Sequence, residues 1–390
     1  MMRTREDSRN YWLLVAMGGL VMVAGLWAAH TMETHGHVIT GMDNQVVWGL
    51  PHVFAIFLIV AASGVLNVAS IGSAFGDPMY KPRARLSGLL SITLLSGGLM
   101  VLMLDLGRPD RVIVAATHYN FRSVFAWNVF LYSGMVGLVA VYLWTMFERR
   151  FNAWSRPAGV AVLVWRFVLT TGTGSIFAFL VARQAYQSAL LAPLFIVLSF
   201  GWGLAVFLIV QGAMYLWNGR TLPQDVVNRL ARLLGVFVAA AAYLVAVFHV
   251  THLYFARQQA FEAFLLWHGA PFAALFWLGY VLVGTLLPLA LLFHPRTRTP
   301  AGLGMAATLV VAGALAWLYV FIIGGQAFPL DIFPGHEARS TFGDGRVATY
   351  HPSWAELVLG VGGIGAAFLL TVIGVRVLDF MPQDDTAAGH

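Results

Sequence analysis

The feature that most constrains this chain is a series of ten apolar runs, each long enough to cross a lipid bilayer as a helix. A backbone inside lipid has no water to bond with, so such segments are expected to be α-helical. Only 10% of the 390 residues are charged, whereas soluble domains carry about 25%. We therefore expect an all-α, polytopic integral membrane protein with about ten transmembrane helices and no sizeable soluble domain. The runs are Tyr11–Ala29, Val47–Ser70, Leu86–Leu106, Val124–Phe147, Gly159–Tyr186, Ala192–Trp217, Leu230–Phe255, Phe264–Phe293, Gly302–Gln326 and Ala355–Val377.

The arginines are divided unevenly between the two alternating sets of loops. One set holds most of them, together with Lys81, and the positive-inside rule places that set in the cytoplasm. Both chain ends fall in this set, so both termini are expected to be cytoplasmic. The charged start, Met1–Asn10, leads into a full-length helix without a small-residue cleavage site, which indicates an anchor rather than a cleaved signal. The long connections then lie on the outer face: His30–Val46, Gly107–Ser123 and Ala327–Trp354.

The histidines are concentrated on the outer side of this topology. Of the twelve, only His294 and His390 fall on the inner side. Histidine is the side chain that most readily takes up and releases protons near neutral pH. The asymmetry therefore indicates chemistry near the outer face. The outer histidines are His30, His35, His37, His52, His118, His249, His252, His268, His336 and His351.

The segment Leu104–Arg111, Leu-Asp-Leu-Gly-Arg-Pro-Asp-Arg, closes the third apolar run with four charged residues. Asp105 still falls in the helical register, where a lone carboxylate is costly and a partner is expected. Arg108, three residues later, is the predicted partner if the helix continues that far. Gly107 and Pro109 favour a helix end. By spacing alone, a helix stop with a local ion pair explains the segment slightly better than a ligand site does; the nearby histidines favour the site.

Three other histidines have competing explanations. His52 follows Pro51 near the start of the second run, where a bond to a neighbouring carbonyl explains it as well as ligand binding. His249 and His252 share a helix face. Hydrogen bonding within the bundle is preferred over a metal site there, because no carboxylate or cysteine is near them in sequence. Haem ligation would need axial pairs from different helices, and no repeated pattern of that kind is present.

Polar groups also follow the inner half of the second run, at Ser63, Asn67 and Ser70. Helix packing explains this stripe first, and a proton path toward Asp105 is the alternative. The chain has no cysteine, which excludes a cysteine-ligated iron–sulfur cluster and thiolate chemistry within it.

Several segments together resemble the NrfD/PsrC family, the integral membrane subunits of polysulfide-reductase-like complexes, and most closely its DsrP branch. They are Asp-Leu-Gly-Arg-Pro at 105–109, Asn44–Gly49 with Pro51-His52, Tyr119-Asn120-Phe121 and Phe125-Ala126-Trp127-Asn128. The resemblance implies a bacterial inner-membrane protein with two four-helix bundles and a quinone site in the first, at the outer face. The expected first bundle is helices two to five (about 47–187) and the second is helices six to nine (about 192–326), with helices one and ten flanking them. It also implies no haem or iron–sulfur cluster in this chain, and electron exchange with a periplasmic, ferredoxin-like iron–sulfur subunit.

The resulting hypothesis is a quinone-interacting membrane subunit of a respiratory or sulfur-metabolism redox complex, with proton translocation left open. A quinone such as menaquinone needs an apolar slot for its ring, hydrogen-bond donors for its oxygens and a titratable group for its protons. The alternatives are a haem-b electron-transfer subunit and a secondary transporter or proton channel. Transporters usually place polar groups near the midplane, which disfavours the last. The expected catalytic residues are Asp105, His52 and Arg108, and the expected quinone-binding residues are Trp48, His52, Trp127, Asn128, His35 and Tyr119.

Overall fold

The computed structural model describes residues 5–330, 345–378 and 380. Within these residues the regular structure is entirely helical, and ten spans are long and apolar enough to cross a membrane. The predicted all-α polytopic fold is therefore confirmed. The spans are Arg9–His35, Leu50–Ala74, Lys81–Leu104, Val124–Phe147, Arg149–Ala178, Leu191–Trp217, Gln224–Tyr254, Phe272–Phe293, Pro300–Ala327 and Trp354–Val377.

The described residues form fifteen α-helices, of which α5 and α10 lie outside the spans, and several of the others are extended by short π-helical or 3-10 turns. The π-helical stretches are Ser70–Ala74, Phe264–His268, Leu275–Leu286 and Val320–Gly324. The α-helices are α1 (Arg5–His35), α2 (Leu50–Gly64), α3 (Leu66–Ala69), α4 (Ala84–Leu104), α5 (Val112–Thr117), α6 (Val124–Phe147), α7 (Ser155–Ala178), α8 (Leu191–Trp217), α9 (Gln224–Tyr254), α10 (Ala256–Ala263), α11 (Phe272–Ala274), α12 (Leu287–Phe293), α13 (Pro300–Tyr319), α14 (Gly325–Ala327) and α15 (Trp354–Val377).

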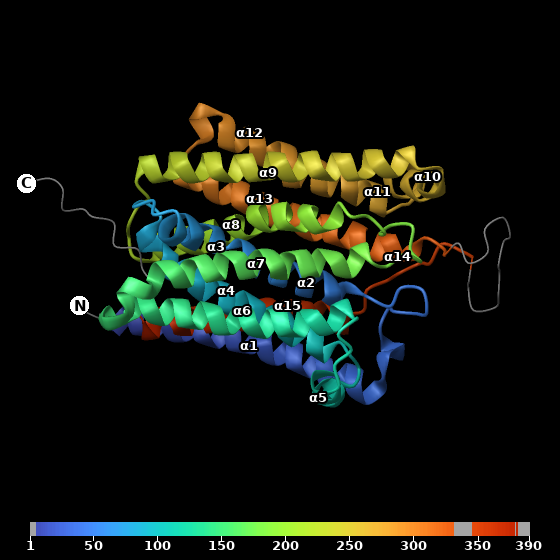
Figure 1. Ribbon diagram of the computed structural model, residues 1–390, viewed down its shortest axis with the longest axis horizontal. Helices are drawn as coiled ribbons and strands as arrows, with labels where there is room; N and C mark the ends of the chain where they lie inside the picture. Colours follow the sequence, from blue (N-terminus) through green and yellow to red (C-terminus); the bar gives the residue numbers. More distant parts are fainter. Residues whose placement is uncertain (1–4, 331–344, 379, 381–390) are drawn as a thin grey trace, which may run out of the picture.

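The long helices fall into two sets by their contacts. In the first helix set, α2 packs against α4 and α7, and α6 packs against α4 and α7. In the second helix set, α13 packs against α8, α9 and α12, and α9 packs against α8 and α12. Helix α1 packs along α15, which in turn covers α4 and α2 (Figure 1). Helix α2 also runs against α8, so the two sets share one continuous apolar core. The division into two bundles at the predicted boundaries stays a proposal.

The closest approach between the two sets is made by glycines. Gly64 on α2 and Gly203 on α8 face each other, and a Cβ on either would collide with the backbone of the other helix. Small residues at such crossings let helix backbones pack tightly in a membrane, where lipid removes the hydrophobic drive for association. This contact places α2 in the interior, where all but one of the residues Pro51–Gly64 are buried.

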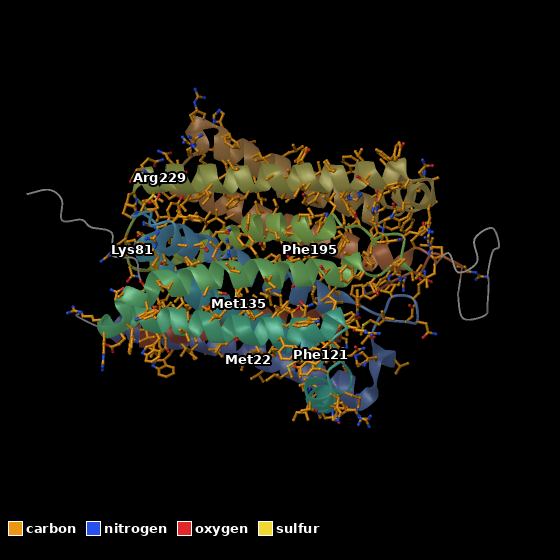
Figure 2. All side chains as sticks on the ribbon, in the orientation of Figure 1. Met22, Lys81, Phe121, Met135, Phe195 and Arg229 are labelled. Carbon is orange, nitrogen blue, oxygen red and sulfur yellow. The ribbon has the colours of Figure 1, made fainter. Side chains whose placement is uncertain are left out.

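The two ends of the bundle differ in their polar content. Helix α1 begins and α15 ends at the same end of the bundle, whereas α5, α10 and α14 lie at the opposite end (Figure 1). Figure 2 shows Lys81 and Arg229 at the first end and Phe121 at the second. The arginine-rich loops and the described ends of the chain therefore lie on one side, as the alternation of spans requires.

Two predicted spans have the wrong boundaries. The fifth was expected to reach Tyr186, but α7 ends at Ala178 and a loop follows, whose Arg183 donates to backbone carbonyls instead of facing lipid. The eighth was expected from Phe264, but it begins at Phe272. Pro271 has no amide hydrogen to continue a helix, and the chain breaks there. The segment before it, α10 with Phe264–His268, is separate from the spans on either side.

Candidate functional site

The end of α4 meets the start of α2 at the end of the bundle opposite to the arginine-rich loops. Asp105 caps the C-terminus of α4, and His52 lies in the first turn of α2 behind Pro51. His52 Nδ1 lies 2.8 Å from Asp105 Oδ2, and the Asp105 side chain is 1% exposed. The predicted proximity of His52 and Asp105 is thus present in the structure, because two antiparallel helices bring their outer ends to one level.

The Asp105 carboxylate keeps unused hydrogen-bonding capacity. Its distance to His52 is that of an ion pair, but the imidazole is not aligned for a hydrogen bond, and neither carboxylate oxygen has a hydrogen-bond partner within the described residues. A buried carboxylate without donors is costly. Asp105 is therefore poised to accept a hydrogen bond from a ligand hydroxyl.

Aromatic side chains pack around His52 and its neighbour Trp48. The Trp48 ring stacks on the His52 ring with centroids 5.8 Å apart and an interplanar angle of 23°. Phe177 from α7 and Phe125 from α6 contact Trp48 edge-on, at 5.6 Å and 6.5 Å. The loop before α2 and the helices α6 and α7 thus contribute flat apolar surface near the histidine, as an aromatic ring would need.

The backbone of Trp48 is held by a glutamine of α14. Gln326 Oε1 accepts from the amides of Val47 and Trp48, each at 3.0 Å, and Gln326 Nε2 donates to the Trp48 carbonyl at 2.9 Å. Arg183 donates to the carbonyls of Gln326 at 2.7 Å and Gln45 at 2.6 Å. Burial lowers the pKa of Arg183, and the nearby Tyr186 hydroxyl opposes that effect. Residues far from α2 in sequence therefore fix the loop that carries Trp48.

Arg108 does not pair with Asp105, so the prediction of that ion pair is wrong. Helix α4 ends at Leu104, and Gly107 adopts a positive φ of 71° that turns the chain away. The i,i+3 geometry is therefore never formed. Arg108 instead lies 3.2 Å from Asp110, and both side chains are exposed. A hydrogen bond from Arg108 lowers the pKa of the Asp110 carboxyl.

A different histidine from the predicted one lies against this helix end. His35 is exposed and contacts the Thr31 carbonyl within its own helix. His37 Nε2 lies 3.2 Å from the carbonyl oxygen of Asp105, and its ring packs where a side chain on Gly107 would project. Gly36 is the residue in the sequence that could have indicated this contact, because its φ of 78° ends the helix and directs His37 back toward the bundle. The spacing of the histidines alone did not indicate the contact.

Two of the other predicted quinone ligands lie in a separate aromatic cluster at the outer end of α6. Tyr119 stacks on Phe130 at 4.3 Å, and the exposed Trp127 packs near Phe121 and donates from Nε1 to the Phe121 carbonyl at 2.8 Å. Within the described residues, their ring contacts are with this cluster and not with His52. The wall beside Trp48 is made by phenylalanines instead.

Asn128 faces the neighbouring helix α7. Its amide nitrogen donates to the carbonyls of Val124 at 2.8 Å and Gly172 at 3.3 Å. The side-chain oxygen is buried and has no partner among the described residues. Asn128 can therefore accept a hydrogen bond through this oxygen.

A second buried ionisable cluster lies in the second helix set. His249 and His252 both contact Glu262, which comes from α10 after the chain reverses at the end of α9. The expectation that these histidines bond within the bundle agrees with the structure. That expectation rested on there being no carboxylate near them in sequence; Glu262, 10 and 13 positions later, reaches them because of a chain reversal that the sequence did not reveal. No group of three or more histidine, cysteine or acidic side chains is arranged to hold a metal ion in the part of the protein that the structure describes.

The protein is similar in sequence to a known protein family and to several individual membrane subunits. A family model described as "Polysulphide reductase, NrfD" matches residues 38–330. The protein is 28% identical to an Hdr-like menaquinol oxidoreductase integral membrane subunit of Archaeoglobus fulgidus, over 97% of its own length and 95% of the relative. It is 25% identical to the C subunit of the polysulfide reductase of Wolinella succinogenes, over 73% and 96%. It is 23% identical to a menaquinone reductase integral membrane subunit of Nitratidesulfovibrio vulgaris, over 92% and 89%.

Proposed function

This protein belongs to the polysulphide reductase NrfD family, and from that premise we propose that it is the quinone-interacting integral membrane subunit of a redox complex. The names of two relatives, a menaquinol oxidoreductase subunit and a menaquinone reductase subunit, support a quinone of the menaquinone class. Family membership indicates which kind of subunit this protein is, but not which of its residues act on the quinone. The residues that act must be argued from the site itself.

The observation that carries the proposal is the buried Asp105 carboxylate beside His52 and Trp48. Its two oxygens lack hydrogen-bond partners among the described residues, and His52, which lies 2.8 Å from the carboxylate, carries the apolar Trp48 ring stacked on its own ring. A quinol offers the complement, namely a hydroxyl donor on the edge of a flat apolar ring. The donor set therefore fits a quinone head group.

Oxidation of a bound quinol to the quinone releases two electrons, which pass to the iron–sulfur partner subunit, and two protons, one from each hydroxyl; the residues of this site take the proton of the hydroxyl that they bind. Asp105 accepts the hydrogen bond of a quinol hydroxyl and holds the proton that leaves it. His52 lies 2.8 Å away and its side chain is 14% exposed. Once its ring turns so that it aligns with the carboxylate, His52 receives that proton and passes it toward the outer aqueous phase. General acid–base transfer of this kind requires groups within hydrogen-bond reach of each other.

Entry to the site is proposed from the lipid between α2 and α6. Phe125, which packs on Trp48, is half exposed on the surface of the bundle. Two cavities among the described residues lie away from this contact, around His249 and around Tyr280. The Trp48–Phe125 contact is therefore the part that must separate to admit a head group.

The remaining assignments belong to the same proposal. The arginine-rich end faces the cytoplasm of a bacterial cell, and the end with Asp105 faces outward. An iron–sulfur subunit docks on the outer face, where Gly107–Ser123 provides an exposed connection. Ala327–Trp354, another long outer connection, is the second docking segment of this proposal, and half of it lies outside the described residues. A reporter that is active only in the periplasm should be silent when fused after His390 and active when fused after Asp331. The opposite result would reverse the orientation.

The haem alternative receives less support from the geometry. An axial pair needs two imidazoles that face each other across a macrocycle. The cavity beside His249 has a volume of about 10 Å³, room for about one water molecule. A reduced-minus-oxidised absorption spectrum of the purified protein distinguishes the two hypotheses, because bound haem gives a Soret band.

The test of the proposal compares two aspartates of one segment in the assembled complex. Asp105→Asn keeps the shape but cannot hold the proton, and should lower quinol turnover about 10- to 100-fold, the equivalent of losing one buried polar interaction. The pH dependence of turnover should change as well. Asp110→Asn, at an exposed carboxylate, is the matched control and should turn over at the wild-type rate. Equal rates for both variants and the wild type would show that Asp105 only ends α4.

A further inference from the structure

The second ionisable cluster, made of His249, His252 and Glu262, has no role in the proposed quinone site. The two histidines are three residues apart and lie on one face of α9. Glu262 Oε2 lies 2.8 Å from His249 Nδ1, and Glu262 Oε1 lies 3.0 Å from His252 Nδ1. The glutamate side chain is fully buried. Each carboxylate oxygen therefore has its own imidazole as partner.

The charge of Glu262 has to be balanced inside the protein. Burial raises the pKa of its carboxyl, but the hydrogen bonds from His249 and His252 outweigh burial, and the pKa is lowered. An ionised, buried carboxylate is costly unless a cation pairs with it. An imidazolium from one of the two histidines would provide that cation.

Other ionisable groups near the cluster are engaged or exposed. In the loop that contributes Ala185, Arg183 donates to backbone carbonyls and Tyr186 donates to the carbonyl of Ile322 at 3.1 Å. Arg257 on α10 and His268 are exposed. The neighbouring stretches of α13 and 320–324 contribute aromatic and aliphatic side chains at this point. Within the described residues the balancing charge therefore falls to His249 or His252.

The two histidines differ in what surrounds their second nitrogen. His252 is 1% exposed, its ring lies 4.1 Å from the Phe248 ring, and its Nε2 is buried without a partner among the described residues. A proton on that nitrogen would be a buried donor with nothing to bond, which is unfavourable. His252 is therefore expected to stay neutral, with its one proton on Nδ1.

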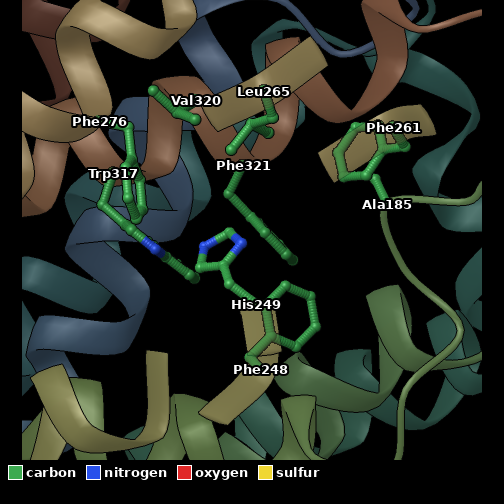
Figure 3. A pocket seen from close by; sticks show the side chains of 9 residues that line it. All are labelled: Ala185, Phe248, His249, Phe261, Leu265, Phe276, Trp317, Val320 and Phe321. Atoms are coloured by element: carbon green, nitrogen blue, oxygen red, sulfur yellow. The ribbon is translucent and has the colours of Figure 1, made fainter. Parts of the chain in front are cut away.

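His249 has room for the second proton. Its ring points into a small cavity between Trp317 and Phe321 (Figure 3). The cavity volume of about 10 Å³ corresponds to about one water molecule. The His249 side chain is also more accessible than its neighbours, at 11% against 1% for His252 and 0% for Glu262. A water in this cavity could accept from His249 Nε2.

We propose that His249 is a protonation site: Glu262 holds it as an imidazolium, and it exchanges one proton with water in the adjoining cavity. In that exchange the Nε2–H bond breaks and the proton passes to water, while both Nδ1–H groups keep their bonds to Glu262. No electron is transferred. His252 acts as a positioning residue that holds the second carboxylate oxygen. The site would give the second helix set a titratable centre separate from Asp105, and it does not depend on the proposed quinone chemistry.

The test is solid-state NMR of the full-length protein in lipid nanodiscs, with ¹⁵N-labelled histidine and ¹³C-labelled glutamate, at neutral pH. A dipolar-recoupling measurement selects nitrogens close to a glutamate carboxyl carbon. The wild type is expected to show an imidazolium in that position, and His249→Gln should remove this signal. His252→Gln should retain the signal, because the charged ring is the other one. Only neutral imidazoles beside the carboxyl, or loss of the signal in His252→Gln instead, would overturn the proposal.

A pair of glutamate variants gives an independent control. Glu262→Gln removes the counter-charge and should abolish the imidazolium signal at neutral pH. Glu356→Gln neutralises another fully buried carboxylate, whose partners are Tyr350 and the backbone amides of Gly41 and Ser353, and should leave the signal unchanged. An unchanged signal in Glu262→Gln would contradict the proposal. If Glu262→Gln fails to fold, the wild-type and histidine measurements still decide the question.

Discussion

The sharpest test of the packing around the site compares two buried glutamines. Gln326 is 2% exposed and makes four hydrogen bonds: it accepts from the amides of Val47 and Trp48, and it donates to the carbonyls of Trp48 and Ile322. Gln211 on α8 is 0% exposed, and neither of its amide atoms has a partner among the described residues. Replacement of each by leucine is the same chemical change in two different surroundings.

The two replacements are expected to change the free energy of unfolding by clearly different amounts. Gln326→Leu leaves both loop amides and the Trp48 carbonyl without their partner. Each abandoned buried group costs about 1–3 kcal/mol, so the three together predict a loss of at least about 3 kcal/mol in the free energy of unfolding. Gln211→Leu removes an unpaired amide and fills the same space with an apolar side chain, so it should be neutral or stabilising.

The assay is equilibrium unfolding of the purified variants in mixed micelles, followed by tryptophan fluorescence. The expected order of stability is Gln211→Leu at or above the wild type, and Gln326→Leu well below it. Quinol turnover by Gln326→Leu should also fall, because Trp48 is no longer held against His52. Variants equal in stability to within about 1 kcal/mol would refute the claim that Gln326 holds this loop.

Three further predictions concern stability. Tyr350→Phe should destabilise by about 1–3 kcal/mol, because the Tyr350 hydroxyl donates to Glu356 Oε1 at 2.6 Å and accepts from the Leu50 amide at 2.7 Å. Burial and the Glu356 charge raise the pKa of Tyr350, so its stabilising contribution is fully present below the unfolded pKa of about 10 and is lost as pH rises through the folded pKa. Alkaline titration of thermal stability should therefore show a smaller loss in Tyr350→Phe than in the wild type, and equal losses would contradict this. Because the pKa of Glu262 is lowered in the folded protein, its ionised carboxylate stabilises the fold above the unfolded pKa of about 4.3, and this stabilisation is lost as pH falls through the folded pKa. The acid limb of the stability–pH curve should therefore be shallower in Glu262→Gln than in the wild type. An identical limb would contradict that. Gly64→Ala should impair folding, because the new Cβ would meet the α8 backbone. Gly137→Ala has open space and should raise stability by about 0.5–1 kcal/mol. Equal yields and melting temperatures for the two variants would refute the claim that α2 and α8 need glycine where they cross.

The sequence was sufficient for the features that follow from hydropathy. The ten apolar runs predicted the spans, and their alternation put both His52 and Asp105 toward the outer face of the membrane. Boundaries failed where one residue overrode the apolar pattern, as at Pro271, or where a polar loop followed an apolar helix end, as at Arg183. Both errors have the same cause, since hydropathy averages over a window and does not register a local break.

Side-chain partners were less predictable because they depend on backbone direction after a helix ends. The positive φ of Gly107 redirects Arg108 to Asp110, and the break at Gly36 brings His37 to the Asp105 carbonyl. The reversal after α9 brings Glu262 to histidines 10 and 13 positions earlier. Each depends on a turn of one or two residues, which spacing along an ideal helix cannot represent.

The most direct test of the central claim is photoaffinity labelling of the assembled complex with an azido-quinone, followed by mass spectrometry of this subunit. The account predicts label within residues 44–57, around Trp48 and His52, or on Phe125. Label there should fall about 10-fold or more in Asp105→Asn and remain unchanged in Asp110→Asn. Label concentrated instead in residues 248–268, around the second ionisable cluster, would contradict the assignment of the quinone to the outer ends of α2 and α4.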